Sequence, residues 1–121
     1  MMKLCWTTIF VKDIEKSIAF YNGLLGLPIA MKHYSNTQKL VMLGEENDAK
    51  VELLENPNVP VSAGNDSITM GFATDSLEKM TEKLTDAGYP VVRGPISPNE
   101  HITFSFFRDP DGYKIQLSES H

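Results

Sequence analysis

The chain has 121 residues, of which 41% are hydrophobic and 22% charged, and its formal net charge is −5. This length and composition predict one globular domain and exclude a disordered or membrane-spanning chain, because no apolar run approaches the roughly 20 residues that cross a bilayer. With no Lys/Arg cluster and no signal-peptide cleavage site, we expect a cytoplasmic protein whose partner is neither nucleic acid nor a membrane.

The first half of the chain predicts a strand, a helix and three further strands. Residues 3–11 are rich in β-branched and aromatic side chains, which favours a buried strand. A helix should follow, with Asp13 as its N-cap and apolar residues at three-to-four spacing until Gly26 and Pro28. Three apolar runs separated by turn-forming residues indicate strands at 28–34, 39–44 and 50–55. The predicted order is therefore βαβββ.

The second half repeats this order. The pattern predicts a helix from Asp75 and four strands, at 67–74, 89–94, 102–107 and 113–118. The helix punctuation also recurs, because Asp13, Gly26 and Pro28 reappear 62 residues later as Asp75, Gly88 and Pro90. An internal duplication is the best account of this match.

The duplication predicts an α+β fold for the single domain at 1–121. We divide it into unit one at 1–57, a linker rich in Pro, Asn and Gly at 58–66, and unit two at 67–121. If each helix covers one face of its sheet, two βαβββ units form a curved mixed sheet around a shared cleft. A small molecule is expected to bind in such a cleft.

Two stretches of the sequence resemble the signatures of a known family. They are VKDIEKSIAFYNGLLGLPI at 11–29 and FFRDPDGYKIQL at 106–117. Both are similar to those of the vicinal oxygen chelate superfamily, which includes glyoxalase I, the fosfomycin and bleomycin resistance proteins and the extradiol dioxygenases. The resemblance covers nearly the whole chain and implies the glyoxalase/bleomycin resistance fold. It also implies a homodimer, because proteins of this family commonly pair.

In the glyoxalase I branch of this family, four side chains in the cleft bind a divalent metal. The resemblance places their positions at Trp6, Glu52, Thr69 and Gln116, where the branch has His or Gln, Glu, His and Glu. Only Glu52 keeps the family's residue. An indole has no lone pair for a metal, a Thr hydroxyl is a poor neutral ligand, and a Gln carbonyl adds no charge. We therefore expect no metal cofactor.

These departures favour a glyoxalase-like protein with a degenerate metal site, which binds a small organic molecule and whose reaction is unassigned. Glu52 is the candidate catalytic residue, because an apolar cleft favours a protonated carboxyl group that suits proton transfer. A carboxylate that only hydrogen-bonds Thr69 or Gln116 is the alternative. The candidate ligand-binding residues are Trp6, Thr8, Met31, His33, Thr69 and Gln116.

The sequence is compatible with two alternative functions, and it does not decide whether the protein is an enzyme. A metal-dependent lyase or isomerase of the lactoylglutathione lyase type would use Glu52 with Zn, Ni or Fe. Its metal could also be held by His33, Glu52 and His101, although their spacing does not require this. A drug-sequestering protein, like the bleomycin resistance proteins, is the second alternative. Arg93 could meet a ligand carboxylate or phosphate, or be a solvated charge.

Overall fold

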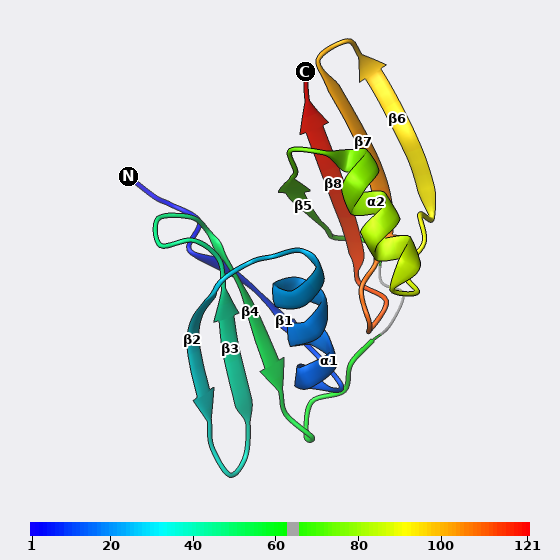
Figure 1. Ribbon diagram of the computed structural model, residues 1–121. Coiled ribbons are helices and arrows are strands. Elements are labelled where there is room, and N and C mark those ends of the chain that lie inside the picture. Colours follow the sequence, from blue (N-terminus) through cyan, green and yellow to red (C-terminus); the bar gives the residue numbers. More distant parts are fainter. Residues whose placement is uncertain (63–65) are drawn as a thin grey trace. The chain divides into compact units, whose positions relative to one another are not determined.

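The computed structural model describes residues 1–62 and 66–121, and the chain divides into two compact units, Met1–Ser62 and Ala63–His121. Part of the expected linker, residues 63–65, lies outside the described residues. Each unit has a four-stranded sheet with a helix against one face (Figure 1). Among the described helices, none has the length and apolar character needed to span a membrane.

Unit one has the predicted βαβββ order, with a short π-helix continuing its α-helix. Its elements are β1 (Trp6–Phe10), α1 (Ile14–Ile18), η1 (Ala19–Leu24), β2 (Ile29–Tyr34), β3 (Lys39–Leu43) and β4 (Lys50–Glu55). The sheet order is β1-β4-β3-β2, in which β1 pairs with β4 in parallel and the other pairs are antiparallel. Asp13 is the N-cap, as predicted, and its carboxylate accepts hydrogen bonds from the backbone N–H groups of Glu15 and Lys16.

Unit two repeats the same topology. Its elements are β5 (Thr69–Ala73), α2 (Leu77–Asp86), β6 (Arg93–Asn99), β7 (Ile102–Arg108) and β8 (Lys114–Ser120). The sheet order is β5-β8-β7-β6, and again only the first pair is parallel. The predicted α+β fold with two βαβββ units is therefore confirmed.

Two predicted boundaries in unit two are wrong. The N-cap of α2 is Ser76 rather than Asp75, because Ser76 has the extended backbone and its hydroxyl accepts from the N–H of Lys79 at 3.2 Å. The strand expected at 89–94 begins later, as β6. Residues 88–89 instead complete the helix terminus, where the N–H of Tyr89 donates to the Leu84 carbonyl at 2.8 Å.

Each sheet buries one face under its helix and leaves the other face open. In unit one the covered face holds Ile9, Val11, Val41, Leu43, Val51 and Leu53, all buried. In unit two it holds Ser105, Phe107, Ile115 and Leu117, which are also buried. Burial of each large apolar side chain contributes about 1.5–3 kcal/mol relative to exposure. The alternate residues of every strand project from the opposite face, which we call the open face of that unit.

Candidate functional site

Five of the predicted site residues share the open face of unit one. The strand register places Thr8, Glu52, Met42 and Met31 in one row across the four strands. Trp6 precedes Thr8 by two residues on β1, and His33 follows Met31 by two on β2, so both project from the same face. The structure therefore brings Trp6, Thr8, Met31, His33 and Glu52 onto one surface.

Glu52 lies in the middle of this surface, where a hydroxyl group orients it. Thr8 Oγ1 donates a hydrogen bond of 2.7 Å to Glu52 Oε1. The other carboxylate oxygen, Oε2, has no hydrogen-bond partner within the described residues. Met42 lies directly opposite Glu52 on β3, which gives the carboxylate an apolar neighbour. A polar ligand could therefore reach one oxygen while Thr8 holds the other in place.

A pocket of about 360 Å³ opens beside this pair in unit one. Trp6 and Met31 lie on the two edge strands of the sheet and nevertheless line the same pocket, with Met42 between them. Their side chains are exposed, Trp6 at 52% and Met31 at 47%. The ammonium group of Lys50, also in the lining, donates to three carbonyl groups of the turn at 45–48. The pocket thus offers an aromatic plane and two thioethers to a ligand.

The remaining two predicted residues, Thr69 and Gln116, lie on the open face of unit two. Thr69 is opposite Lys114, whereas Gln116 lies between Gly71 and Phe106 in the neighbouring row. Gly71 leaves space beside the Gln116 amide, because a Cβ there would lie 3.9 Å from Gln116 Oε1. The amide can therefore both donate to and accept from a ligand at this point.

Sequence reasoning missed the positive charge around Gln116. Arg93 and Lys114 lie over the ring of Phe106, with 5.7 Å from the guanidinium carbon and 4.7 Å from the ammonium nitrogen to the ring centroid. Phe104 meets the same ring edge-to-face at 5.6 Å. Strand alternation in FFR and KIQ could have placed Phe106, Lys114 and Gln116 together, but Arg93 joins them only through the true position of β6.

A third cation on this face is already neutralised. Arg108 makes a two-pronged ion pair with Asp66 and donates a further hydrogen bond of 3.0 Å to the Gly112 carbonyl. The hydrogen bond from Arg108 lowers the pKa of Asp66, to which the positive charges of Arg108 and Lys114 also contribute. Arg108 therefore has a structural role, joining the turn after β7 to the start of unit two.

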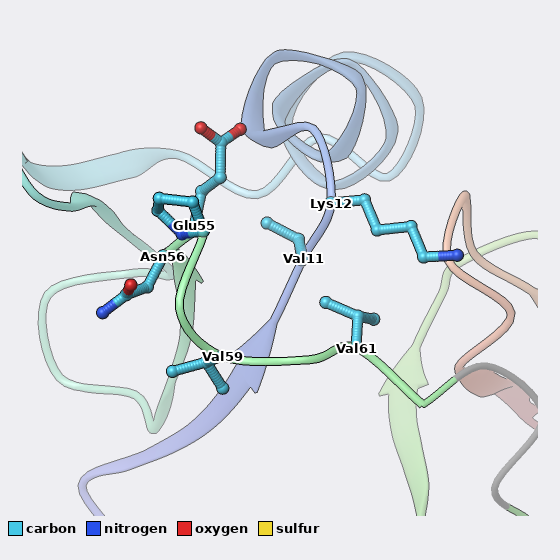
Figure 2. A pocket seen from close by; sticks show the side chains of 7 residues that line it. Val11, Lys12, Glu55, Asn56, Val59 and Val61 are labelled. Carbon is cyan, nitrogen blue, oxygen red and sulfur yellow. The ribbon is translucent and has the colours of Figure 1, made fainter.

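A second pocket in unit one, of about 310 Å³, lies near the start of α1 (Figure 2). Val11, Val59 and Val61 surround it, and Glu55 stands at its edge. The carboxylate of Glu55 is used by the fold, because it accepts from the N–H of Ile14 at 2.9 Å. Its other oxygen lies 3.8 Å from the ammonium group of Lys39. The pocket therefore combines apolar walls with a carboxylate that caps a helix.

Unit two has a pocket of about 410 Å³ beside the start of α2, with Glu119 in its lining. Its Glu119 accepts from the N–H of Leu77 at 2.8 Å, just as Glu55 does from Ile14 in unit one. The second oxygen of Glu119 lies 3.3 Å from Nδ1 of His121, whose Nε2 lies 2.9 Å from the hydroxyl of Thr103. The shared helix cap shows that the two units are alike in side-chain contacts as well as in topology.

Residues 1–62 and 66–121 contain no group of three or more His, Cys, Asp and Glu side chains arranged to hold a metal ion. Of the alternative metal-binding set, His33 and Glu52 belong to unit one and His101 to unit two, so this set stays a prediction. His33 lies on β2 of unit one, whereas the His101 imidazole of unit two lies 3.6 Å from the exposed carboxylate of Glu100.

Comparisons with known proteins agree with this architecture. A family model described as the Glyoxalase/Bleomycin resistance protein/Dioxygenase superfamily matches residues 3–117. A probable lactoylglutathione lyase of Synechocystis sp. is 33% identical over 98% of this chain and 96% of its own length. The trypanothione-dependent glyoxalase I of Leishmania major superposes with a TM-score of 0.81, at 24% identity, over 97% of this chain and 86% of its own.

A further solved structure is an antibiotic-binding protein, TnmS3 from Streptomyces sp. CB03234. Its TM-score is 0.74 at 20% identity, over 100% of this chain and 98% of its own. The two structural likenesses show a shared fold, and the family model and the lyase relative show common descent over nearly the whole length. The chain therefore belongs to the glyoxalase, bleomycin resistance protein and dioxygenase superfamily, also called the vicinal oxygen chelate superfamily.

Proposed function

We propose that this protein is a glyoxalase-like member of its superfamily that binds a small organic molecule on its open sheet faces, without the divalent metal of glyoxalase I. The observation that carries the proposal is the Thr8–Glu52 hydrogen bond, which sets a carboxylate on a largely apolar surface beside the pocket of Trp6 and Met31. Apolar walls with a few oriented polar groups are the usual composition of a small-molecule site.

The donor chemistry at the four family positions supports the metal-free part of the proposal. Trp6 offers no lone pair, Thr69 and Gln116 offer neutral oxygens, and Glu52 alone offers a charge. Divalent Zn, Ni or Fe sites generally take three or four His, Cys or carboxylate ligands. This donor set does not fit such a metal.

The side chains have separable roles in this proposal. Trp6 and Met31 exclude water from the apolar part of the ligand and supply contact area. Thr8 orients Glu52, whose free Oε2 accepts a hydrogen bond from the ligand or takes a proton from it. His33 supplies a further hydrogen bond on the open face of unit one, and Thr69 and Gln116 offer hydrogen bonds on the open face of unit two. A reaction at this site would require Glu52 to exchange a proton with the ligand at Oε2.

A thermal-shift screen of the metal-free full chain against metabolites and drugs tests the proposal. A molecule present at 100 times its Kd stabilises the folded protein by about 2.7 kcal/mol, which is a clear shift. We expect such a molecule to lose affinity with Trp6→Ala and with Glu52→Gln, whereas Glu78→Gln on the exposed side of α2 should have no effect. A ligand whose affinity both site variants leave unchanged would contradict the proposed site.

A lactoylglutathione lyase activity is the second candidate, favoured by the 33% identity to the Synechocystis relative. Here Glu52 would move the substrate proton, and Zn, Ni or Fe would have to be bound by unusual ligands. Turnover of the methylglyoxal–glutathione hemithioacetal should be measured with Ni, Co and Zn added. A rate at background, or one that Glu52→Ala leaves unchanged, removes this candidate.

A drug-sequestering function is the third candidate, to which the shared fold with an antibiotic-binding protein draws attention. Recovery of the stabilising molecule unaltered after long incubation would distinguish sequestration from turnover.

Because proteins of this superfamily commonly form dimers, we also propose that this protein is a homodimer. Light scattering during gel filtration tests it, and a molar mass equal to the chain's 13.5 kDa across the working concentration range would refute it.

A further inference from the structure

We infer that the open face of unit two binds an organic anion, and that Arg93 and Lys114 recognise its carboxylate or phosphate group. This inference rests on the proposed function, since it names the chemical class of the molecule that the open faces bind. It adds two residues, one on β6 and one on β8, to those that the family pattern suggests.

The aromatic ring of Phe106 holds both cations in place. Phe106 is the direct cross-strand neighbour of Arg93 on one side and of Gln116 on the other. The guanidinium carbon of Arg93 lies 5.7 Å from the ring centroid, and the ammonium nitrogen of Lys114 lies 4.7 Å from it. Both distances are within the range of cation–π attraction, so the ring reduces the freedom that these long side chains would lose on binding a ligand.

The open face of unit two carries positively charged side chains, whereas the protein as a whole has a negative net charge. The chain carries a formal net charge of −5, yet the open-face positions of β5 to β8 include three cations and no Asp or Glu. The three are Arg93, Arg108 and Lys114. Since Asp66 takes up the charge of Arg108, the face retains an excess of positive charge next to Gln116.

The donors of these two cations are available to a ligand. Within the described residues, neither Arg93 nor Lys114 makes a hydrogen bond or a close ion pair. The Gln116 amide lies beside them, and Gly71 leaves the space next to that amide clear. A guanidinium fork, an ammonium group and an amide at neighbouring positions on one sheet face suit a carboxylate or phosphate, which accepts several hydrogen bonds at once.

The competing explanation is that Arg93 and Lys114 merely cover a half-buried ring. In that case their stems would pack on Phe106 and their charges would serve only solvation. The two explanations differ in what they predict for affinity. Covering requires only a long side chain, whereas recognition requires the charge.

Four benzene derivatives separate these explanations by calorimetric titration of the metal-free full chain. They are benzoate, phenyl phosphate, benzamide and benzylamine, which carry a carboxylate, a phosphate, a neutral amide and an ammonium group on the same ring. We expect benzoate or phenyl phosphate, and neither of the others, to bind, and the better of the two identifies the anionic group. Equal binding of benzamide and benzoate would overturn the inference.

Variants then locate the anion. Arg93→Gln and Lys114→Gln should each weaken binding of the preferred anion about tenfold, because each removes a charge-assisted hydrogen bond. Lys114→Arg, which keeps the charge, should bind within about threefold of wild type, and Lys83→Gln on α2 is the matched control. Unchanged affinity in both Gln variants would also overturn the inference. The proposed function would survive either failure if a neutral molecule bound in a Glu52-dependent manner.

Discussion

At the scale of single residues, the Thr8–Glu52 pair is the most informative contact in unit one. The resemblance implies that Glu52 is the one family ligand position that keeps its carboxylate, and the structure gives it a neutral hydroxyl as its partner at 2.7 Å. Glu52 is thus fixed by a residue of its own sheet, which leaves its second oxygen for a ligand.

Thr8→Val tests whether this hydrogen bond stabilises the fold. Valine keeps the branched shape, so the variant removes little besides the hydroxyl, and we expect the free energy of unfolding to fall by about 0.5–1.5 kcal/mol. Urea unfolding of wild type, Thr8→Val and Thr8→Ser measures it, with Ser retaining the donor. If Thr8→Val is as stable as wild type, the hydrogen bond does not contribute measurably to the stability of the fold.

The environment of Tyr34 makes its contribution to folding stability depend on pH in the alkaline range. Partial desolvation raises the pKa of Tyr34 from 10.0 to about 12, and the hydrogen bond from its hydroxyl to Glu15 acts in the same direction. Because the folded pKa lies above the unfolded one, the contribution is complete below about pH 10 and is lost as the pH rises towards 12.

Tyr34→Phe should remove this alkaline limit. The variant is expected to be less stable than wild type near pH 8, and the difference between the two should shrink through the window in which Tyr34 titrates. Urea unfolding at a series of pH values from neutral to strongly alkaline provides the comparison. Two stability profiles that stay parallel across that window would show that Tyr34 does not couple folding to pH.

At the scale of elements, a carboxylate from the last strand of each unit caps that unit's helix. Glu55 accepts from the first N–H of α1, and Glu119 does the same for α2, at 2.9 and 2.8 Å. Both carboxylates face the positive end of a helix dipole, which favours negative charge there. The caps fix the end of each helix against its sheet.

Removal of the carboxylate that caps one helix should lower the stability of the fold. We expect Glu119→Ala to lower the free energy of unfolding by about 1 kcal/mol, whereas Glu119→Gln, which keeps an oxygen acceptor, should cost less. Chemical denaturation of both variants gives the values, with Glu100→Ala as the control, because the Glu100 side chain is 87% exposed. Equal losses for the Ala and Gln variants would mean that the charge, and not the acceptor, matters.

The sequence predicted the elements well where local signals were strong. Alternating and apolar runs located seven of the eight strands, and the N-cap and glycine signals located both helices to within one residue at their starts. β6 was misplaced, because its sequence RGPISPN contains two prolines and no regular alternation. Its pairing with β7 is broken by register shifts, so only tertiary contacts define the strand.

At the scale of the whole molecule, the two units share a topology but present different open faces. Unit one offers apolar side chains around the carboxylate of Glu52, whereas unit two offers Arg93 and Lys114 around Phe106. The resemblance implied that Trp6 and Glu52 share a cleft, and strand alternation placed Thr8 on the same face as Trp6. The sequence could not predict the Thr8–Glu52 bond, which depends on the register between the distant strands β1 and β4. Nor could it predict the place of Arg93, which depends on the irregular pairing of β6 with β7.

Metal stoichiometry tests the central claim most directly, namely that this member of the superfamily binds its ligand without a divalent metal. The measurement is elemental analysis of the full chain, purified without chelator, incubated with Zn, Ni or Fe and then freed of loosely bound ions. Because an indole, a hydroxyl and an amide at Trp6, Thr69 and Gln116 are poor ligands for such ions, we predict far less than one retained metal ion per chain. One tightly held ion per chain that is lost with Glu52→Ala would contradict the account.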